Sequence, residues 1–204
     1  MTTVPKVVVF DCDGVLVDSV SSWKTLHDHF GTDNSHNLKR FIDGEISDME
    51  FMRLDIKMWK DIQDPIYRDE LFRSYSGVKV MPGAKELVAE LKSAGIFVAI
   101  VSAGVDLFVS SIAAMLKVDD WIANGFEFND DDTLSDEGIC RLHASKKNLI
   151  ITRYWKCRDL NLKIVYLLET QRWTFQCRLK GADSLASIQP ENRQSWPLPM
   201  QGFQ

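Results

Sequence analysis

The chain lacks several features that would indicate a membrane, secreted or nucleic-acid-binding protein. No stretch reaches the roughly 18 continuous apolar residues of a transmembrane helix, although 45% of the 204 residues are hydrophobic. The first apolar run is short and ends in acidic residues, unlike a secretory signal. A net charge of -5 argues against a nucleic-acid or anionic-membrane partner. The composition therefore favours one globular domain, or one domain with a small insertion.

Cysteine is also scarce. The four cysteines, Cys12, Cys140, Cys157 and Cys177, lie far apart and form no CxxC pair. Metal-binding and disulfide frameworks usually show closer, regular cysteine spacing. We therefore expect reduced thiols and a cytoplasmic protein.

What is present is an alternation of strands and helices. Residues 7–10 form a continuous apolar run that predicts a strand buried on both faces of a parallel sheet. Pro82 and Gly83 predict the start of a helix with Leu87, Val88 and Leu91 on its apolar face, and a second strand follows at residues 96–102. A further helix is expected over residues 105–118. This order predicts an α/β fold with a doubly wound, Rossmann-like parallel sheet.

Two segments interrupt this alternation. Residues 19–75 show only amphipathic helical patterns, and Ser47 with Glu50 predicts a capping box before the apolar positions Phe51, Leu54 and Met58. Residues 121–139 predict a pair of strands around an acidic turn at 130–132. The predicted organisation is an α/β core at 1–18 and 76–149, a helical cap at 19–75, and a separate tail at 150–204.

Two acidic residues follow the first predicted strand. Asp11 and Asp13 stand two positions apart, and Ser102 ends the second predicted strand. Ligands of such sheets bind beyond the carboxyl ends of the strands. One carboxylate there could attack phosphorus while the other transfers a proton, with Ser102 and backbone N–H groups holding phosphoryl oxygens. Mg²⁺ would offset the negative charge.

Simpler interpretations stand beside this one. An acidic pair at a strand end is often only a solvated turn, and many strands end in serine. A calcium loop is excluded, because Val15 and Leu16 occupy positions that would need an acid and a glycine. His27 and His29 are expected on different faces of a helix, which argues against a metal-ligand pair.

The segment "VVVFDCDGVLVDS" resembles the first motif of the haloacid dehalogenase-like hydrolases, and "VAIVSAG" resembles the second. The second acid, at Asp13, is typical of the phosphatases of this family. The cap position and the residues that follow "VAIVSAG" are similar to phosphoserine phosphatases. The resemblance covers roughly residues 4–149. It implies that Asp11 is the nucleophile and a metal ligand, and that Asp13 is the general acid/base and binds metal through its carbonyl.

The same resemblance implies the rest of the site. Phosphate binding falls to Ser102 and Ala103, and the family's phosphate-neutralising lysine is Lys146 or Lys147, between which the sequence does not choose. Arg53, nine residues after Gly44, matches an arginine that holds a substrate carboxylate, although a solvated helix residue would look the same. The position of the family's amine-binding glutamate is occupied by Val20, a departure from the phosphoserine pattern.

The tail differs in composition from the rest. Residues 150–204 hold eight Lys+Arg and four Asp+Glu, while residues 1–149 hold 16 and 25. The family's fourth motif, G-D-S-x-x-D, is missing at its expected place, where only Glu169 supplies an acid. Codons compatible with residues 167–177 can encode that motif in a shifted frame, which suggests a frameshifted translation beginning near 148–153. A genuinely divergent tail is the alternative, and the coding DNA would decide between them.

These observations predict a Mg²⁺-dependent phosphatase that acts on a small phosphorylated metabolite, similar to phosphoserine, through an aspartyl-phosphate. Loss of the fourth motif predicts impaired activity. The alternative is a degenerate, non-catalytic member that binds a phosphorylated ligand or a protein partner. A phosphomutase shares the first motif but fits the second less well.

Overall fold

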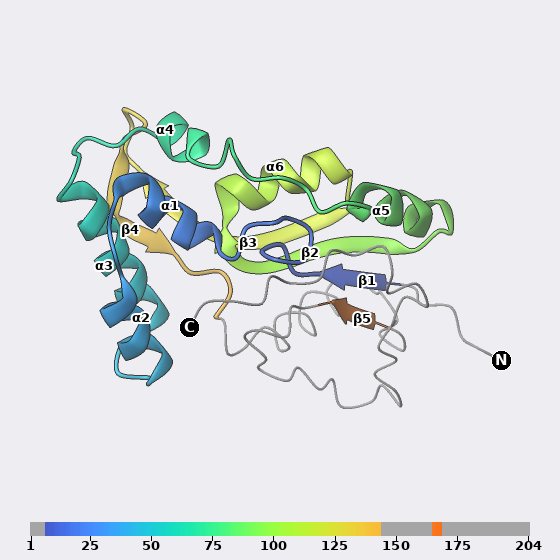
Figure 1. The fold of residues 1–204 in the computed structure, drawn as a ribbon, viewed down its shortest axis with the longest axis horizontal. Helices are drawn as coiled ribbons and strands as arrows, with labels where there is room; N and C mark the ends of the chain where they lie inside the picture. The colour runs from blue at the N-terminus through green and yellow to red at the C-terminus, as the bar shows by residue number, and fades with distance from the viewer. Residues whose placement is uncertain (1–6, 144–164, 169–204) are drawn as a thin grey trace.

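The computed structural model describes residues 7–143 and a strand at 165–168. Its five strands form one sheet in the order β4-β3-β2-β1-β5 (Figure 1). The strands are β1 Val7–Phe10, β2 Phe97–Val105, β3 Asp120–Phe128, β4 Leu134–Ile139 and β5 Val165–Leu168. β1 pairs in parallel with β2 and β5, β2 pairs in parallel with β3, and β3 pairs antiparallel with β4. The predicted parallel sheet and the strand pair at its edge are confirmed.

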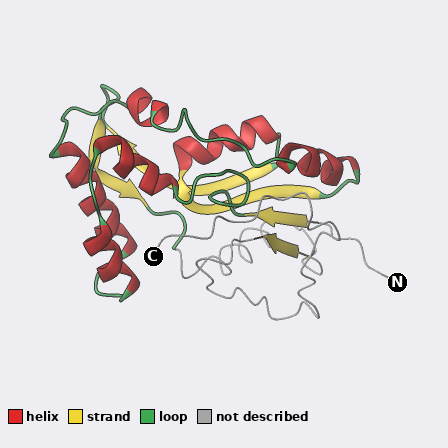
Figure 2. Cartoon of the chain, viewed as in Figure 1, coloured by secondary structure: helices red, strands yellow, loops and turns green. Residues whose placement is uncertain are grey.

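Helices supply the remaining layers. They are α1 Ser22–Phe30, α2 Ser35–Ile42, α3 Asp48–Lys60, α4 Arg68–Arg73, α5 Ala84–Ser93 and α6 Asp106–Leu116. The first four follow one another between β1 and β2, as the helical patterns predicted, and gather toward one end of the sheet (Figure 1). α5 and α6 lie over one face of the sheet (Figure 2). The structure is therefore an α/β fold with a helical insertion after its first strand.

The core has two parts because successive strand residues point to opposite faces. Val8 and Phe10 of β1 belong to the larger apolar cluster, which includes residues of α5 and α6. Val7 and Val9 belong to a smaller cluster on the other face, with Leu142. All four residues of β1 are at most 3% exposed. The continuous apolar run of β1 thus reflects burial on both faces.

The two ends of the helical insertion are joined by backbone pairing. Val17 forms an antiparallel bridge with Val80, and the Asp18 N–H donates to the carbonyl of Lys79 at 2.9 Å. The Met81 N–H donates to the carbonyl of Leu16 at 2.8 Å. The chain therefore leaves the sheet and returns to it at one place. The cap boundaries at 19 and 75 stay a prediction.

Two details of the sequence-based expectations are wrong. β2 does not end at Ser102 but runs on to Val105, with an irregular register against β3 between Val101 and Val105. Leu87, expected on the apolar face of α5, is 39% exposed. In α3 the buried apolar residues are Met52, Ile56 and Trp59, whereas the apolar positions after the capping box, Phe51, Leu54 and Met58, are only partly buried.

The difference in α3 has a physical cause. Phe51 stacks on Phe41 of α2, with ring centroids 4.9 Å apart, so α3 carries a second apolar face against α2. A helix that is apolar on two sides shows two overlapping periodicities, and the sequence alone does not say which side meets the core.

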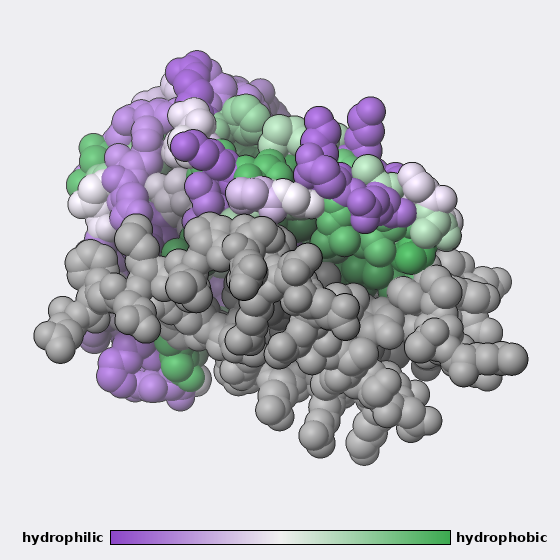
Figure 3. Space-filling view, turned by 45° about the vertical axis from the view of Figure 1, so that its right-hand side comes forward, coloured by the Kyte–Doolittle hydropathy of each residue, from purple (hydrophilic) through white to green (hydrophobic). Residues whose placement is uncertain are grey.

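On the face shown in Figure 3, hydrophilic residues gather mainly at the left and top of the described part, and the largest group of hydrophobic residues lies toward the right. Within residues 7–143 and 165–168, no helix is long and apolar enough to cross a membrane.

Candidate functional site

The site begins where β1 ends. β1 lies between β2, which follows it in the chain after the helical insertion, and β5, which comes last. The strand order therefore reverses beside β1, and open α/β sheets bind ligands at the carboxyl ends of strands next to such a reversal. Asp11 is the first residue beyond β1, so the acidic pair lies at the place where this fold favours a ligand.

A tight turn follows the strand. The carbonyl of Cys12 accepts N–H groups from Val15, Leu16 and Val17, at 3.2, 2.9 and 3.3 Å. Gly14 has φ of 68°, a left-handed conformation that glycine adopts without steric cost. The Asp11 Oδ1 atom accepts the N–H of Cys12 at 2.8 Å. This turn fixes the backbone on both sides of Asp13.

Asp13 is anchored to the first helix of the insertion. Its Oδ2 atom accepts the N–H of Ser22 at 3.0 Å and the Ser22 hydroxyl at 2.8 Å. Ser22 is the first residue of α1, so the carboxylate lies at a helix N-terminus, where the helix dipole stabilises negative charge. The Ser22 hydroxyl in turn accepts the N–H of Val105 at 2.9 Å. One buried hydroxyl thus joins the acid after β1 to the end of β2.

Gly104 shows how closely these groups approach. A methyl group at this glycine would lie 2.5 Å from Ser22 Oγ, 2.7 Å from Asp13 Oδ2 and 3.2 Å from Ser102 Oγ. The carboxylate of Asp13 and the hydroxyl of Ser102 therefore both lie within 3.2 Å of one point. The structure brings together two of the side chains that the sequence placed in one site.

The segment Ser102–Gly104 departs from regular strand pairing. Its residues fall within the register irregularity between β2 and β3, a feature often found beside functional sites. Ser102 is 1% exposed, and its Oγ accepts the N–H of Gly104 at 3.1 Å. The carbonyl of Ala103 accepts the indole N–H of Trp23 at 3.0 Å. α1 therefore supports both the acid after β1 and the segment predicted to bind phosphate.

A buried tyrosine completes the surroundings of Asp13. The Tyr75 hydroxyl donates to the carbonyl of Ser22 at 3.2 Å. Burial, followed by the negative charges of Asp13 and Asp106, raises the pKa of Tyr75 well above its usual value. Tyr75 therefore stays a neutral hydrogen-bond donor at physiological pH and adds no charge to the site.

The other predicted site residues are placed differently. Arg53 lies on α3, and its Nε is 2.7 and 2.8 Å from the two carboxylate oxygens of Glu137 on β4. These hydrogen bonds raise the pKa of Arg53. Val20 is 62% exposed. Lys146, Lys147 and the segment that would carry the fourth motif lie outside the described residues, except for the backbone of β5.

The two histidines of α1 lie in different surroundings. His27 is 2% exposed, and its Nε2 lies 3.3 Å from Asp55, which is fully buried on α3. The His29 side chain is 36% exposed and lies 3.6 Å from Glu70. The two rings therefore contact different residues.

Sequence reasoning missed Ser22 and Gly104. No local pattern distinguishes Ser22 from its neighbours Ser19 and Ser21, because its role depends on a contact nine residues back and another 83 residues ahead. Gly104 follows "VSA" directly, and a glycine within a strand can signal close approach of other atoms. That signal was available in the sequence.

A groove elsewhere on the surface does not include the acidic pair. It is lined by residues of α4, α6, β3, β4 and the loop after β4, among them Asp106, Trp121 and Arg141. Asp106 and Arg141 form an ion pair of 2.7 Å. Ser22 and Ser102 do not line this groove either.

The fold and this arrangement define a class: an α/β core with a mostly parallel sheet, an acidic pair after β1 and a helical insertion between β1 and β2. A model of the haloacid dehalogenase-like hydrolase family matches residues 8–147. The chain belongs to this family, which confirms the expectation from the two motifs.

Curated relatives point to one branch. The phosphoserine phosphatase of Archaeoglobus fulgidus is 32% identical over 123 residues, which cover 60% of this chain and 35% of that protein. The phosphoserine phosphatase of Methanocaldococcus jannaschii is 26% identical over 159 residues, covering 78% of this chain and 74% of that protein. The chain therefore spans about a third of the length of the first relative and about three quarters of the second.

A solved structure supports the fold. The structure described as a phospho-aspartyl intermediate analogue of phosphoserine phosphatase matches with a TM-score of 0.65 and 22% identity. The match covers 81% of this chain and 78% of the other.

Proposed function

We propose that this chain is a phosphatase that hydrolyses a small phosphomonoester, similar to phosphoserine, through an aspartyl-phosphate on Asp11. Membership of the hydrolase family and similarity to two phosphoserine phosphatases support the reaction class. The observation that carries the proposal is the convergence of Asp13 and Ser102 on one point at Gly104.

The reaction has two halves. In the first, the Asp11 carboxylate attacks phosphorus, the ester P–O bond breaks, and Asp13 donates its proton to the leaving alcohol oxygen. In the second, Asp13 takes a proton from water, which attacks the same phosphorus and releases inorganic phosphate and the Asp11 carboxylate. Ser102 and the backbone N–H groups beside it hold phosphoryl oxygens. The hydrogen bonds from Ser22 keep the Asp13 side chain oriented through both halves.

The residues at the end of β1 fit a magnesium ion. Asp11 would bind it through its carboxylate and Asp13 through its main-chain carbonyl, and both are oxygen donors, which Mg²⁺ prefers. When bound, Mg²⁺ neutralises the negative charge of the carboxylates and the phosphoryl group. In the family the fourth motif would complete this set, and this chain lacks that motif at its expected place in the tail, which lies outside the described residues except for the backbone of β5.

The proposed substrate is a small phosphorylated metabolite, and the proposed location is the cytoplasm. Cys140 is a free thiol, which agrees with a reducing compartment. Val20, in place of the family's glutamate, argues for a substrate that differs from phosphoserine near its amine.

Turnover of p-nitrophenyl phosphate tests the proposal. We expect Mg²⁺-dependent release of phosphate that falls on the order of 10⁴-fold or more in Asp11→Asn. The control is Asp28→Asn, an exposed aspartate that pairs with Lys24, four residues earlier. Wild-type turnover that is unchanged in Asp11→Asn would contradict the proposed nucleophile.

A second candidate is a non-catalytic family member that binds a phosphorylated ligand or a protein partner. The engagement of Arg53 by Glu137 favours it, because this arginine is already paired. The coding DNA and a frame-corrected chain separate the two. Turnover only in the frame-corrected chain would indicate that the tail impairs an enzyme. No turnover in either chain, with phosphate still bound, would favour the second candidate.

A further inference from the structure

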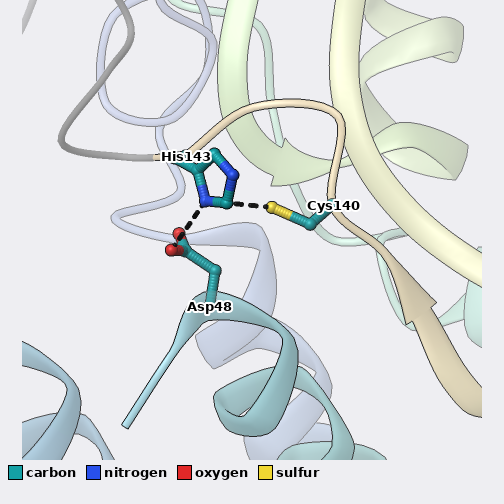
Figure 4. A group of neighbouring side chains, drawn as sticks. All are labelled: Asp48, Cys140 and His143. Carbon is teal, nitrogen blue, oxygen red and sulfur yellow. Dashed lines mark hydrogen bonds and ion pairs between the residues drawn. The ribbon is translucent and has the colours of Figure 1, made fainter. Parts of the chain in front are cut away.

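Three metal-binding side chains meet away from the acidic pair. Asp48, Cys140 and His143 each offer one ligand atom, and these three atoms all lie within 4.8 Å of one another (Figure 4). His143 Nδ1 is 2.9 Å from Asp48 Oδ2 and 3.6 Å from Cys140 Sγ. Around a tetrahedral zinc ion with ordinary bond lengths, ligand atoms lie about 3.3–3.6 Å apart. The two distances from Nδ1, 2.9 and 3.6 Å, lie near this range.

The packing of α3 on β4 brings the cluster together. Asp48 is the first residue of α3, while Cys140 and His143 follow the end of β4. A methyl group at Gly138 of β4 would lie 2.5 Å from Met52 Cε, so the glycine permits close contact between helix and strand. Lys60 pairs with Asp136 at 2.6 Å farther along the same two elements. The helix and the strand are therefore held in one register along their length.

The loop that carries the two softer ligands is also fixed. The Asn124 side chain on β3 accepts the N–H groups of Arg141 and Leu142, at 2.9 and 2.8 Å, and donates to the Leu142 carbonyl at 2.9 Å. The Leu142 side chain is fully buried. Both residues between Cys140 and His143 are thus anchored. A preformed loop loses little conformational freedom when it binds an ion.

The cluster does not have the geometry of a nucleophilic cysteine site. In such sites the histidine contacts the thiol with one ring nitrogen and the acid with the other. Here the thiol and the carboxylate both face the same nitrogen, Nδ1. Burial and the charge of Asp48 also raise the pKa of the Cys140 thiol, whereas a nucleophilic cysteine needs a lowered one. A metal ion between the three side chains would bind Nδ1, the nitrogen that both the thiol and the carboxylate already face.

We propose that Asp48, Cys140 and His143 form a second metal site, which takes a transition-metal ion, with Zn²⁺ as the preferred occupant. Thiolate, imidazole and carboxylate are the ligand types that zinc combines, and magnesium prefers oxygen alone. On binding, the Cys140 thiol gives its proton to water and sulfur takes the metal. The His143 side chain is 45% exposed and that of Asp48 is 22% exposed, so the site is open to solvent, which can supply a fourth ligand.

The site would act as a link between two parts of the chain. Asp48 belongs to the helical insertion after β1, whereas Cys140 and His143 belong to the loop after β4. A bound ion ties these parts together, because all three ligands must hold their positions at once. We therefore expect Zn²⁺ to raise the melting temperature of the full chain.

Cobalt absorption tests the site without reference to turnover. Co²⁺ added to the reduced full chain should give a thiolate-to-cobalt charge-transfer band at one equivalent, and Zn²⁺ should displace it. The band should disappear in Cys140→Ser and persist in Cys157→Ser combined with Cys177→Ser. His143→Gln should weaken Co²⁺ binding at least about tenfold, while His36→Gln, at an exposed histidine of α2, should leave it unchanged.

Several results would overturn the proposal. The first is the absence of the band in the wild-type chain, and the second is its persistence in Cys140→Ser. If the band also disappears in the double serine variant while Cys140→Ser keeps it, the thiolate ligand is Cys157 or Cys177. Circular dichroism of each variant shows whether loss of the band accompanies unfolding. If Cys140→Ser unfolds, the His143→Gln titration decides, because that side chain is nearly half-exposed. Asp11→Asn should retain the band, which separates this site from the proposed magnesium site.

Discussion

Two polar clusters of this chain are built in opposite ways. The cluster around Asp13 is enclosed, because Ser22 is fully buried and Ser102 is 1% exposed. The Ser22 hydroxyl joins Asp13, nine residues earlier, to Val105, 83 residues later. The polar cluster between α3 and β4, which includes Arg53 and Glu137, faces solvent. The side chains of these two residues are 53% and 41% exposed. The first resembles the interior of the protein in its packing, and the second resembles its surface.

This difference in burial predicts how much stability each cluster loses when a contact is removed. A buried hydroxyl that loses its partners leaves polar groups without solvent, which is costly. An exposed ion pair that is broken exchanges one set of contacts for water. We therefore expect substitutions that remove a hydrogen-bonding group from the Asp13 cluster, or add atoms to it, to cost stability. Substitutions in the exposed α3–β4 cluster should cost little stability.

The largest effect is expected for turnover in Asp13→Asn. The amide keeps an oxygen that can accept both hydrogen bonds from Ser22, so the fold should be retained. It cannot transfer the proton, so kcat should fall about 10²- to 10⁴-fold. Steady-state kinetics with p-nitrophenyl phosphate measure this, with Asp28→Asn as the control. Unchanged kcat would remove Asp13 from the reaction and leave it a structural residue.

Next is Gly104→Ala, which tests how tightly the enclosed cluster is packed. The added methyl would fall within 2.7 Å of oxygens of both Ser22 and Asp13, and neither residue can move without breaking its hydrogen bonds. We expect a loss of about 3 kcal/mol in the free energy of unfolding, measured by urea denaturation.

Gly77→Ala is the matched control for that change, because nothing lies within 4 Å of a methyl group there and no positive φ is recorded for this glycine. It should alter the stability far less. Equal losses in the two variants would show that the space around Gly104 is not the cause.

Ser22→Ala should follow, with a loss of about 1–3 kcal/mol. The change removes the donor to Asp13 and leaves the buried N–H of Val105 without its acceptor. Ser93→Ala is the control, because its hydroxyl lies on the exposed end of α5 and donates only to Ala89. Thermal unfolding of both variants measures the difference. A Ser22→Ala variant as stable as the control would mean that water replaces the hydroxyl.

The smallest effect on stability is expected for Arg53→Gln. Its ion pair with Glu137 is exposed, and such pairs contribute little, so the melting temperature should match that of the wild-type chain. Substrate preference makes this variant informative. If Arg53 binds a substrate carboxylate, kcat/KM for phosphoserine should fall while that for p-nitrophenyl phosphate stays constant. A parallel fall for both substrates would contradict that role.

The elements with one strong pattern were predictable. The apolar run of β1, the helical patterns before residue 76 and the Pro82–Gly83 pair before α5 each gave the correct element, because each depends on neighbours along the chain. The acidic pair was placed correctly at the carboxyl end of β1 for the same reason.

The sequence left open what only packing decides. The α3 sequence is apolar on two sides, and packing placed Met52 and Trp59 in the core while Phe51 met α2. The predicted end of β2 at Ser102 was wrong because β2 runs on to Val105, through Gly104, which lies close to Asp13 and Ser22. The cluster of Asp48, Cys140 and His143 was invisible in the sequence, since 92 residues separate its first two members.

The sequence by itself determined the order of the elements, the family and the position of the acids, because periodicity and motif spacing act over a few residues. Only the tertiary structure decided which hydroxyl holds Asp13, where Arg53 is paired, and that a thiol and an imidazole meet the start of α3. Those contacts arise when distant segments are packed into one volume, and their geometry depends on every side chain that shares it.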